Sequence, residues 1–101
     1  MASRLELQSK LEELLGMKHV YYQPPESKKL EYPAIVYSKS GIANKKADDR
    51  RYHQMIQYVL IIIDRMPDNP VIEKLLDLPY CSYDRSYVED NLNHDSLTIY
   101  F

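Results

Sequence analysis

The chain has 101 residues, with 13 basic and 15 acidic side chains and a formal net charge of −2 at pH 7. This length fits one domain and leaves no room for two. Hydrophobic residues make up 45% of the chain, a globular proportion that excludes disorder or a fibrous repeat. The lack of a basic excess argues against a dedicated nucleic-acid-binding protein.

Cysteine and glycine are scarce. The single Cys81 excludes an intramolecular disulfide and a multi-cysteine zinc site, and it suggests a reducing compartment. Only two glycines occur, so a glycine-rich phosphate loop is absent. We expect no signal peptide, because residues 1–6 lack a long apolar stretch. We expect no membrane span, because the longest apolar run, Val59 to Ile63, is far too short.

The first predicted element is a helix over residues 3–15. Ser3 and Glu6 have the spacing of a capping box, and Gly16 stands where a left-handed C-cap is favoured. Leucines at spacings of three and four form one apolar stripe: Leu7, Leu11, Leu14 and Leu15.

Three strands are expected next. Residues 19–23 form a short strand that ends at Pro24, and residues 34–37 form a second one rich in β formers. Residues 38–49 are polar and small, which indicates a long exposed loop or the arms of a protruding hairpin. The third strand, residues 51–64, alternates at first and then becomes continuously apolar. Its length suggests that half lies in the sheet and half reaches beyond the domain.

A second helix follows, with Asn69 as its cap and Pro70 at its first position, and Pro79 ends it. Its apolar side comprises Val71, Ile72, Leu75, Leu76 and Leu78. Strands are then expected over 80–87 and 97–101, with a turn at 89–91. The order α-β-β-β-α-β-β predicts an α+β two-layer sandwich, with two helices packed on an antiparallel or mixed sheet of four to five strands. Residues 1–101 form one domain, with an exposed loop or hairpin at about 38–51.

The most site-like cluster is Asn93-His94-Asp95, with Asp90 nearby. These residues could be metal ligands or an acid/base pair. However, a second His or Cys at ligand spacing is lacking, and Asn, His and Asp also suit a turn. We favour the turn.

Two further candidates are weaker. Asp84 and Arg85 are adjacent on a predicted strand, so they should point to opposite faces and favour a cross-strand or intersubunit ion pair over a substrate clamp. Cys81 has no cationic neighbour and is read as a small buried hydrophobe; nothing supports a dyad with His94 or His53. We expect no enzyme activity, no catalytic residue, no metal and no cofactor.

Basic residues gather in predicted loops, at Lys28, Lys29, Lys39, Lys45 and Lys46. Such loops can contact phosphates without sequence specificity, or simply be solvated. The run from Val59 to Ile63 needs cover on both faces, and two short helices can cover only one face of a sheet. Together with ten tyrosines, this predicts contact with another copy or a partner.

Several segments together resemble a known family. They are LLG (14–16), VYYQPP (20–25), YPAIVY (32–37), YVLIIID (58–64), LDLPYCSYDR (76–85), DNLNHD (90–95) and the ending LTIYF (97–101). The chain resembles the small tail-completion, or tail-terminator, proteins that join head to tail in tailed bacteriophages and prophages of Gram-positive bacteria. The likeness covers nearly the whole chain, and its motifs are structural rather than catalytic.

The resemblance implies a virion structural protein of the neck, assembled in the host bacterial cytoplasm. Such proteins form a homo-oligomeric, hexameric ring that ends the tail tube and joins it to the head–tail connector. Non-specific contact with packaged DNA in the ring lumen is one role for the basic loop. The expected oligomer or partner contacts are Tyr52, Gln54, Ile56, Tyr58, Asp84 and Arg85. The expected lumen or tube contacts are Lys39, Lys45, Lys46 and Arg50.

Three alternatives stay open. One is another neck component, such as a head-completion or minor capsid protein. The second is a small metal-dependent enzyme built on Asp90, His94 and Asp95. The third is a nucleic-acid-binding module that uses Lys28, Lys29, Lys45 and Lys46.

Overall fold

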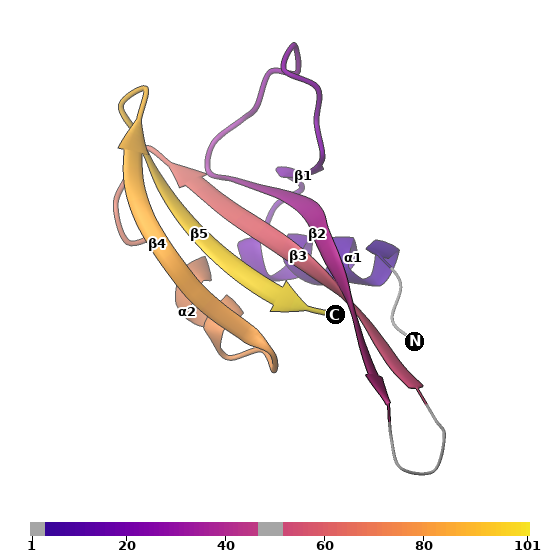
Figure 1. Ribbon diagram of the computed structural model, residues 1–101. Helices are drawn as coiled ribbons and strands as arrows, with labels where there is room; N and C mark the ends of the chain where they lie inside the picture. The colour runs from indigo at the N-terminus through magenta and orange to yellow at the C-terminus, as the bar shows by residue number, and fades with distance from the viewer. Residues whose placement is uncertain (1–3, 47–51) are drawn as a thin grey trace.

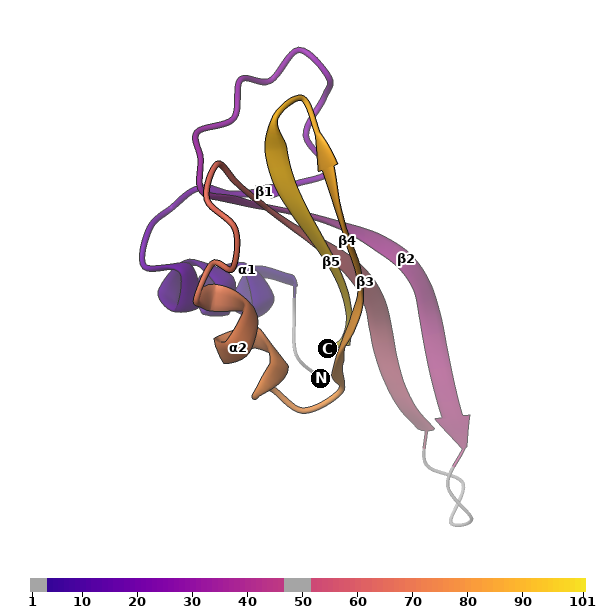
Figure 2. The ribbon, with the colours of Figure 1, turned by 90° about the vertical axis from the view of Figure 1, so that its left-hand side faces the viewer.

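The protein has two layers, a five-stranded sheet and a pair of helices on one side of it (Figures 1 and 2). The computed structural model describes residues 4–46 and 52–101, and for the strand residues 42–46 and 52–55 it describes the backbone alone. The elements are α1 (Arg4–Leu15), β1 (Val20–Tyr22), β2 (Ala34–Lys46), β3 (Tyr52–Asp64), α2 (Val71–Leu76), β4 (Cys81–Glu89) and β5 (Leu92–Tyr100). The predicted α+β sandwich and its element order are confirmed.

The sheet is mixed, with the strand order β1-β2-β3-β5-β4. β1 runs parallel to β2, and the other three pairs are antiparallel. Because β1 has three residues, it covers only the stretch of β2 from Ile35 to Tyr37. The two edges of the sheet are therefore a very short strand and the nine-residue β4.

Local signals at the helix ends agree with the sequence. Gly16 has a φ of 81° and donates its N–H to the carbonyl of Glu12 at 2.9 Å, as expected of a C-cap. Ser3 lies outside the described residues. The Asn69 side chain accepts a 2.9 Å hydrogen bond from the Val71 N–H, so it satisfies a free donor at the start of α2. α2 ends at Leu76, two residues before the expected end.

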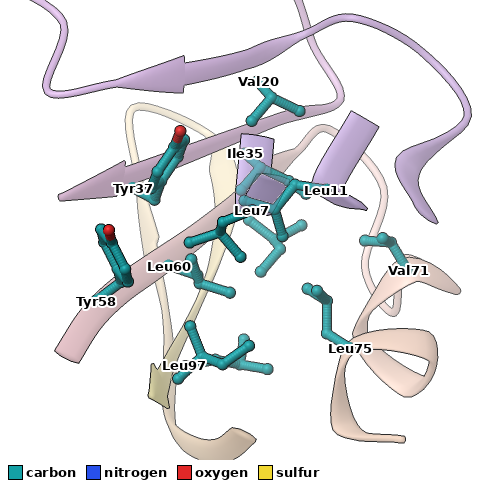
Figure 3. Close-up of a cluster of buried hydrophobic side chains, with 12 residues drawn as sticks. Leu7, Leu11, Val20, Ile35, Tyr37, Tyr58, Leu60, Val71, Leu75 and Leu97 are labelled. Carbon is teal, nitrogen blue, oxygen red and sulfur yellow. The ribbon is translucent and has the colours of Figure 1, made fainter. Parts of the chain in front are cut away.

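The core lies between the helices and one face of the sheet (Figure 3). On β3 the side chains of Tyr58, Leu60 and Ile62 point into this core, because successive residues of a strand point to opposite faces. Ile63 is also buried, on the second face of the sheet next to Ala34. The helices contribute Leu7, Leu11, Val71 and Leu75; the strands contribute Val20, Ile35, Tyr37, Tyr58, Leu60, Ile62, Leu97 and Ile99.

A polar network at the edge of this core connects α1 to β1 and β2. The Tyr37 hydroxyl donates to Gln8 Oε1 and accepts a 3.2 Å bond from Arg4 Nη1. The Gln8 amide in turn donates to the Val20 carbonyl at 3.0 Å. The Tyr37 ring lies 5.9 Å from the ring of Tyr58, in an edge-to-face arrangement. Burial raises the pKa of both tyrosines.

β2 and β3 form a long hairpin whose two strands have thirteen residues each. Of the two interpretations of residues 38–49, the hairpin is the one confirmed as far as Lys46, and the strand expected to end at Tyr37 continues through it. The two strands pair as far as Lys46 and Tyr52, with a register shift between Lys39 and Gly41. The hairpin projects beyond the rest of the sheet (Figures 1 and 2), and the molecule measures 50 Å along its longest axis against 25 and 22 Å.

The C-terminal hairpin differs from the prediction. β4 and β5 are joined by Asp90 and Asn91, whose φ angles of 53° and 61° suit a tight two-residue turn. β5 therefore begins at Leu92 and contains residues 93–95, so the turn expected there is wrong. Both segments are rich in residues that tolerate left-handed backbone, and Asp90-Asn91 takes that conformation.

None of the helices in the described part of the chain is both long and apolar enough to cross a membrane.

We expect Tyr37→Phe to lower the free energy of unfolding by about 1–2 kcal/mol at pH 7, because Gln8 Oε1 loses its donor. In the folded chain the raised pKa values keep Tyr37 and Tyr58 neutral. The contribution of these two neutral side chains to the free energy of unfolding is complete below the ordinary tyrosine pKa of about 10. It is lost as the pH rises through the raised pKa values. Urea unfolding at pH 7 and at pH 11 should therefore show that the free energy of unfolding falls less with rising pH in Tyr37→Phe than in the wild type. Tyr100→Phe is the control, and equal alkaline losses in Tyr37→Phe and the wild type would contradict the prediction.

Candidate assembly surface

The second face of the sheet carries no helix from the described part of the chain. Figure 2 shows α1 and α2 together on the opposite side. The register places Val36 opposite Ile61, and Val59 opposite Thr98, all alternating with core residues. We call this surface the open face; on β2, β3 and β5 it comprises Val36, Ser38, Gln57, Val59, Ile61, His94, Ser96, Thr98 and Tyr100, all partly exposed.

A row of aromatic and basic groups continues the open face onto β4. His94 stacks on Tyr87, with ring centroids 4.8 Å apart and planes inclined by 16°. The Arg85 guanidinium lies 4.9 Å from the centroid of the Tyr87 ring. His94 Nδ1 is 3.0 Å from the Leu92 carbonyl, which places a proton on Nδ1. These groups are typical of protein contact surfaces, where aromatic residues and arginine are enriched.

A bulge brings Asp84 onto the same face as Arg85. The register shifts between Tyr83 and Arg85, so Asp84 is an extra residue in β4. Its carboxylate accepts a 2.7 Å hydrogen bond from the Thr98 hydroxyl, on the open face. The expectation that Asp84 and Arg85 point to opposite faces is wrong because the bulge interrupts the alternation. Within the described chain neither side chain forms an ion pair, so the intersubunit ion pair stays a prediction.

The cluster of His94 and Asp95 does not form an acid/base pair. The two side chains lie on opposite faces of β5, His94 against Tyr87 and Asp95 against Tyr83. The Tyr83 hydroxyl donates to Asp95 at 2.7 Å, and this hydrogen bond raises the pKa of Tyr83. Asp90 lies in the turn. In residues 4–46 and 52–101, His, Cys, Asp and Glu side chains nowhere group as a metal site would require.

Cys81 packs partly buried against the core, opposite Ile99. Burial, and secondarily the charge of Asp84, raises the pKa of the thiol and keeps it protonated. His94 lies opposite Tyr87, six residues farther along β4, which is about 20 Å away. Cys81 and His94 therefore form no dyad. For His53 the structure describes the backbone alone.

The remaining predicted contacts belong to the hairpin. Lys39 is exposed, and Ile56 is half-buried and exchanges two backbone hydrogen bonds with Phe101. Tyr58 is 2% exposed, so its prediction as a contact residue is wrong. It lies on the same face of β3 as the core residue Leu60, and Ile61 lies on the other face. Arg50 lies outside the described residues, and the backbone alone is described for Lys45, Lys46, Tyr52 and Gln54.

Sequence reasoning missed most of the open face. The run from Val59 to Ile63 is apolar at every position, which hides which residues point inward. Val36, Thr98 and Tyr100 were not singled out. The alternation in Leu97-Thr98-Ile99-Tyr100 was the available signal, because it separates two core residues from two open-face residues.

No known protein-family model matches the chain, and no curated protein is significantly similar to it.

Neighbouring isoleucines on β3 offer a matched test of the two faces. Ile62 is 1% exposed, so Ile62→Thr should lower the free energy of unfolding by about 2–4 kcal/mol through lost packing and a buried hydroxyl. Ile61 lies on the open face, and Ile61→Thr should cost less than about 1 kcal/mol in the monomer. Urea unfolding of both variants measures the difference, and similar losses would mean that both faces are packed within one chain.

Proposed function

We propose that the chain is a virion structural protein of the tailed-phage head–tail junction. Copies assemble side by side into a closed ring that ends the tail tube and offers a surface to the head connector. In this role the chain carries out no chemistry; it provides shape and contact surfaces. The proposal extends the sequence resemblance, which spans nearly the whole chain.

The observation that carries the proposal is the open face. Over the residues that the structure describes, the chain forms a five-stranded sheet with both helices on one side. Val36, Val59 and Ile61 lie near the middle of the other side and are only partly shielded. Burying such apolar area stabilises an assembly by about 25 cal/mol per Å² before the costs of association. We assign this face to contact with the last ring of the tail tube.

The projecting hairpin supports the same role. It extends the contact surface well beyond the domain, and β2 carries Lys39, Lys45 and Lys46 without an acidic residue. In a ring, six copies of this basic segment would lie at equal intervals around the axis. Such a circle of lysines suits non-specific contact with DNA phosphates or with an acidic rim of the tube.

The test uses the full chain and tail tubes of the phage whose genome encodes it. Added before elongation is complete, the protein should bind one tube end and stop further addition of tube subunits, visible as capped tubes of fixed length in negative-stain images. Ile61→Thr should weaken capping at least tenfold, because a polar group enters the apolar contact. The matched control is Met66→Thr, at a residue that is 68% exposed in the loop before α2.

Unchanged elongation in the presence of wild-type protein would contradict the proposal. Binding to the isolated head connector with no effect on tubes would instead favour the other neck positions, head completion or minor capsid.

A further inference from the structure

Each edge of the sheet leaves backbone hydrogen-bonding groups unpaired within the part of the chain that the structure describes. β4 is an edge strand of nine residues, and seven of them are exposed. At the other edge, β1 pairs with β2 as far as Tyr37, and the Gln23 side chain accepts from the Lys39 N–H at 3.2 Å. Beyond that point, the stretch Gly41–Lys46 pairs only with β3 within the described chain. Free edges of this kind can accept another strand.

Two backbone hydrogen bonds establish which backbone groups of β5 face which neighbouring strand. The Tyr100 N–H donates to the Tyr80 carbonyl at 3.1 Å, toward β4. The Phe101 N–H donates to the Ile56 carbonyl at 3.0 Å, toward β3. Because these directions alternate along an antiparallel ladder, even-numbered residues of β5 bond to β4 and odd-numbered ones to β3.

The outward-facing groups of β4 follow from this alternation. Ser86 lies opposite Asp95 and Val88 opposite Asn93, both odd-numbered. The N–H and C=O groups of Ser86 and Val88 therefore point away from the sheet. The side chain of Val88 is also 69% exposed, and Tyr80, just before β4, is 68% exposed. The regular stretch after the bulge, Arg85–Glu89, is thus an open docking edge with exposed apolar groups.

We propose that the free edge of β2, Gly41–Lys46, of one copy pairs with the Arg85–Glu89 edge of β4 in the next copy. The inference rests on the proposed ring and specifies its lateral contact. The edges differ, so the contact is head-to-tail, as a closed ring requires. Strand addition of this kind joins the sheets of successive copies through backbone hydrogen bonds.

The lengths and the charges of the two free edges both favour a second copy of the chain as the partner. A six-residue free stretch meets a five-residue one, and a two-stranded ribbon without a third strand is only marginally stable in water. The free stretch of β2 carries Lys45 and Lys46 and no acidic residue, whereas the edge of β4 and its two flanking residues carry Asp84, Glu89 and Asp90 against one arginine. Opposite charges favour this pairing over an edge with its own kind. The outer edge of β3 is a poorer choice, because Phe101 already occupies it at Ile56.

The test compares Ser86→Pro with Ser86→Ala in the full chain. Proline removes an N–H that points outward, so the ladder to β5 is kept while an added strand loses a hydrogen bond and meets the ring. Alanine keeps the N–H and removes only the hydroxyl. Light scattering behind size exclusion, with protein alone and on tail tubes, gives the mass of the assembly. We expect the association constant to fall about tenfold or more in Ser86→Pro and to stay at the wild-type value in Ser86→Ala.

Hydrogen exchange of the wild type keeps the test independent of the proline variant. The amides of Ser86 and Val88 should exchange at least tenfold more slowly in the assembly than in the monomer. Wild-type assembly by Ser86→Pro, fast exchange of both amides in the assembled form, or a wild type that stays monomeric even on tubes would each overturn the edge pairing.

The two proposals fail in different ways. An assembly that depends on Ser86 but ignores tube ends would contradict the head–tail role and leave the edge pairing intact. Capping of tubes by an assembly whose Ser86 and Val88 amides exchange fast would support the role and overturn the pairing.

Discussion

One constraint governs this molecule: in the described residues, two short helices cover one face of a five-stranded sheet and leave the middle of the other face partly exposed. Leu7 and Leu11 of α1 and Leu75 of α2 close a single apolar core against the strands. Within residues 4–46 and 52–101, no helix packs on the second face. Stability within the chain therefore depends on the helical side, and the open face is available for contact with other molecules.

The sequence predicted the parts of the fold that depend on local or periodic signals. The leucine stripe, Gly16 and Asn69 located the helices, and the long alternating and apolar stretch located β3. It did not locate the start of β5, because the turn potential of Asp90-Asn91 and of residues 93–95 is similar and only strand pairing distinguishes them. The bulge at Asp84 is also decided by pairing, and it has no local sequence signal.

The candidate surface was predictable in kind and less so in detail. Composition and the apolar run indicated that two helices would leave part of the sheet uncovered, and Val59 and Ile61 are partly exposed. Which residues remain uncovered depends on the phase of the alternation, and the run from Val59 to Ile63 conceals that phase. Tyr58 illustrates the consequence: its place in an alternating stretch suggested a contact residue, yet its ring is buried in the core, 5.9 Å from the ring of Tyr37. Which strands lie at the edges of the sheet depends on the strand order, and no local sequence signal determines that order.

The central claim, that the open face is covered in the assembly, can be tested by hydroxyl-radical footprinting of free and assembled protein. Tyr100 and Tyr87 report on the open face, and Met17 and Met66 report on exposed positions outside it. We predict that oxidation of the two tyrosines falls several-fold on assembly while the two methionines stay reactive. Tyrosines that remain equally reactive in the assembled protein, with Met17 or Met66 protected instead, would contradict the account.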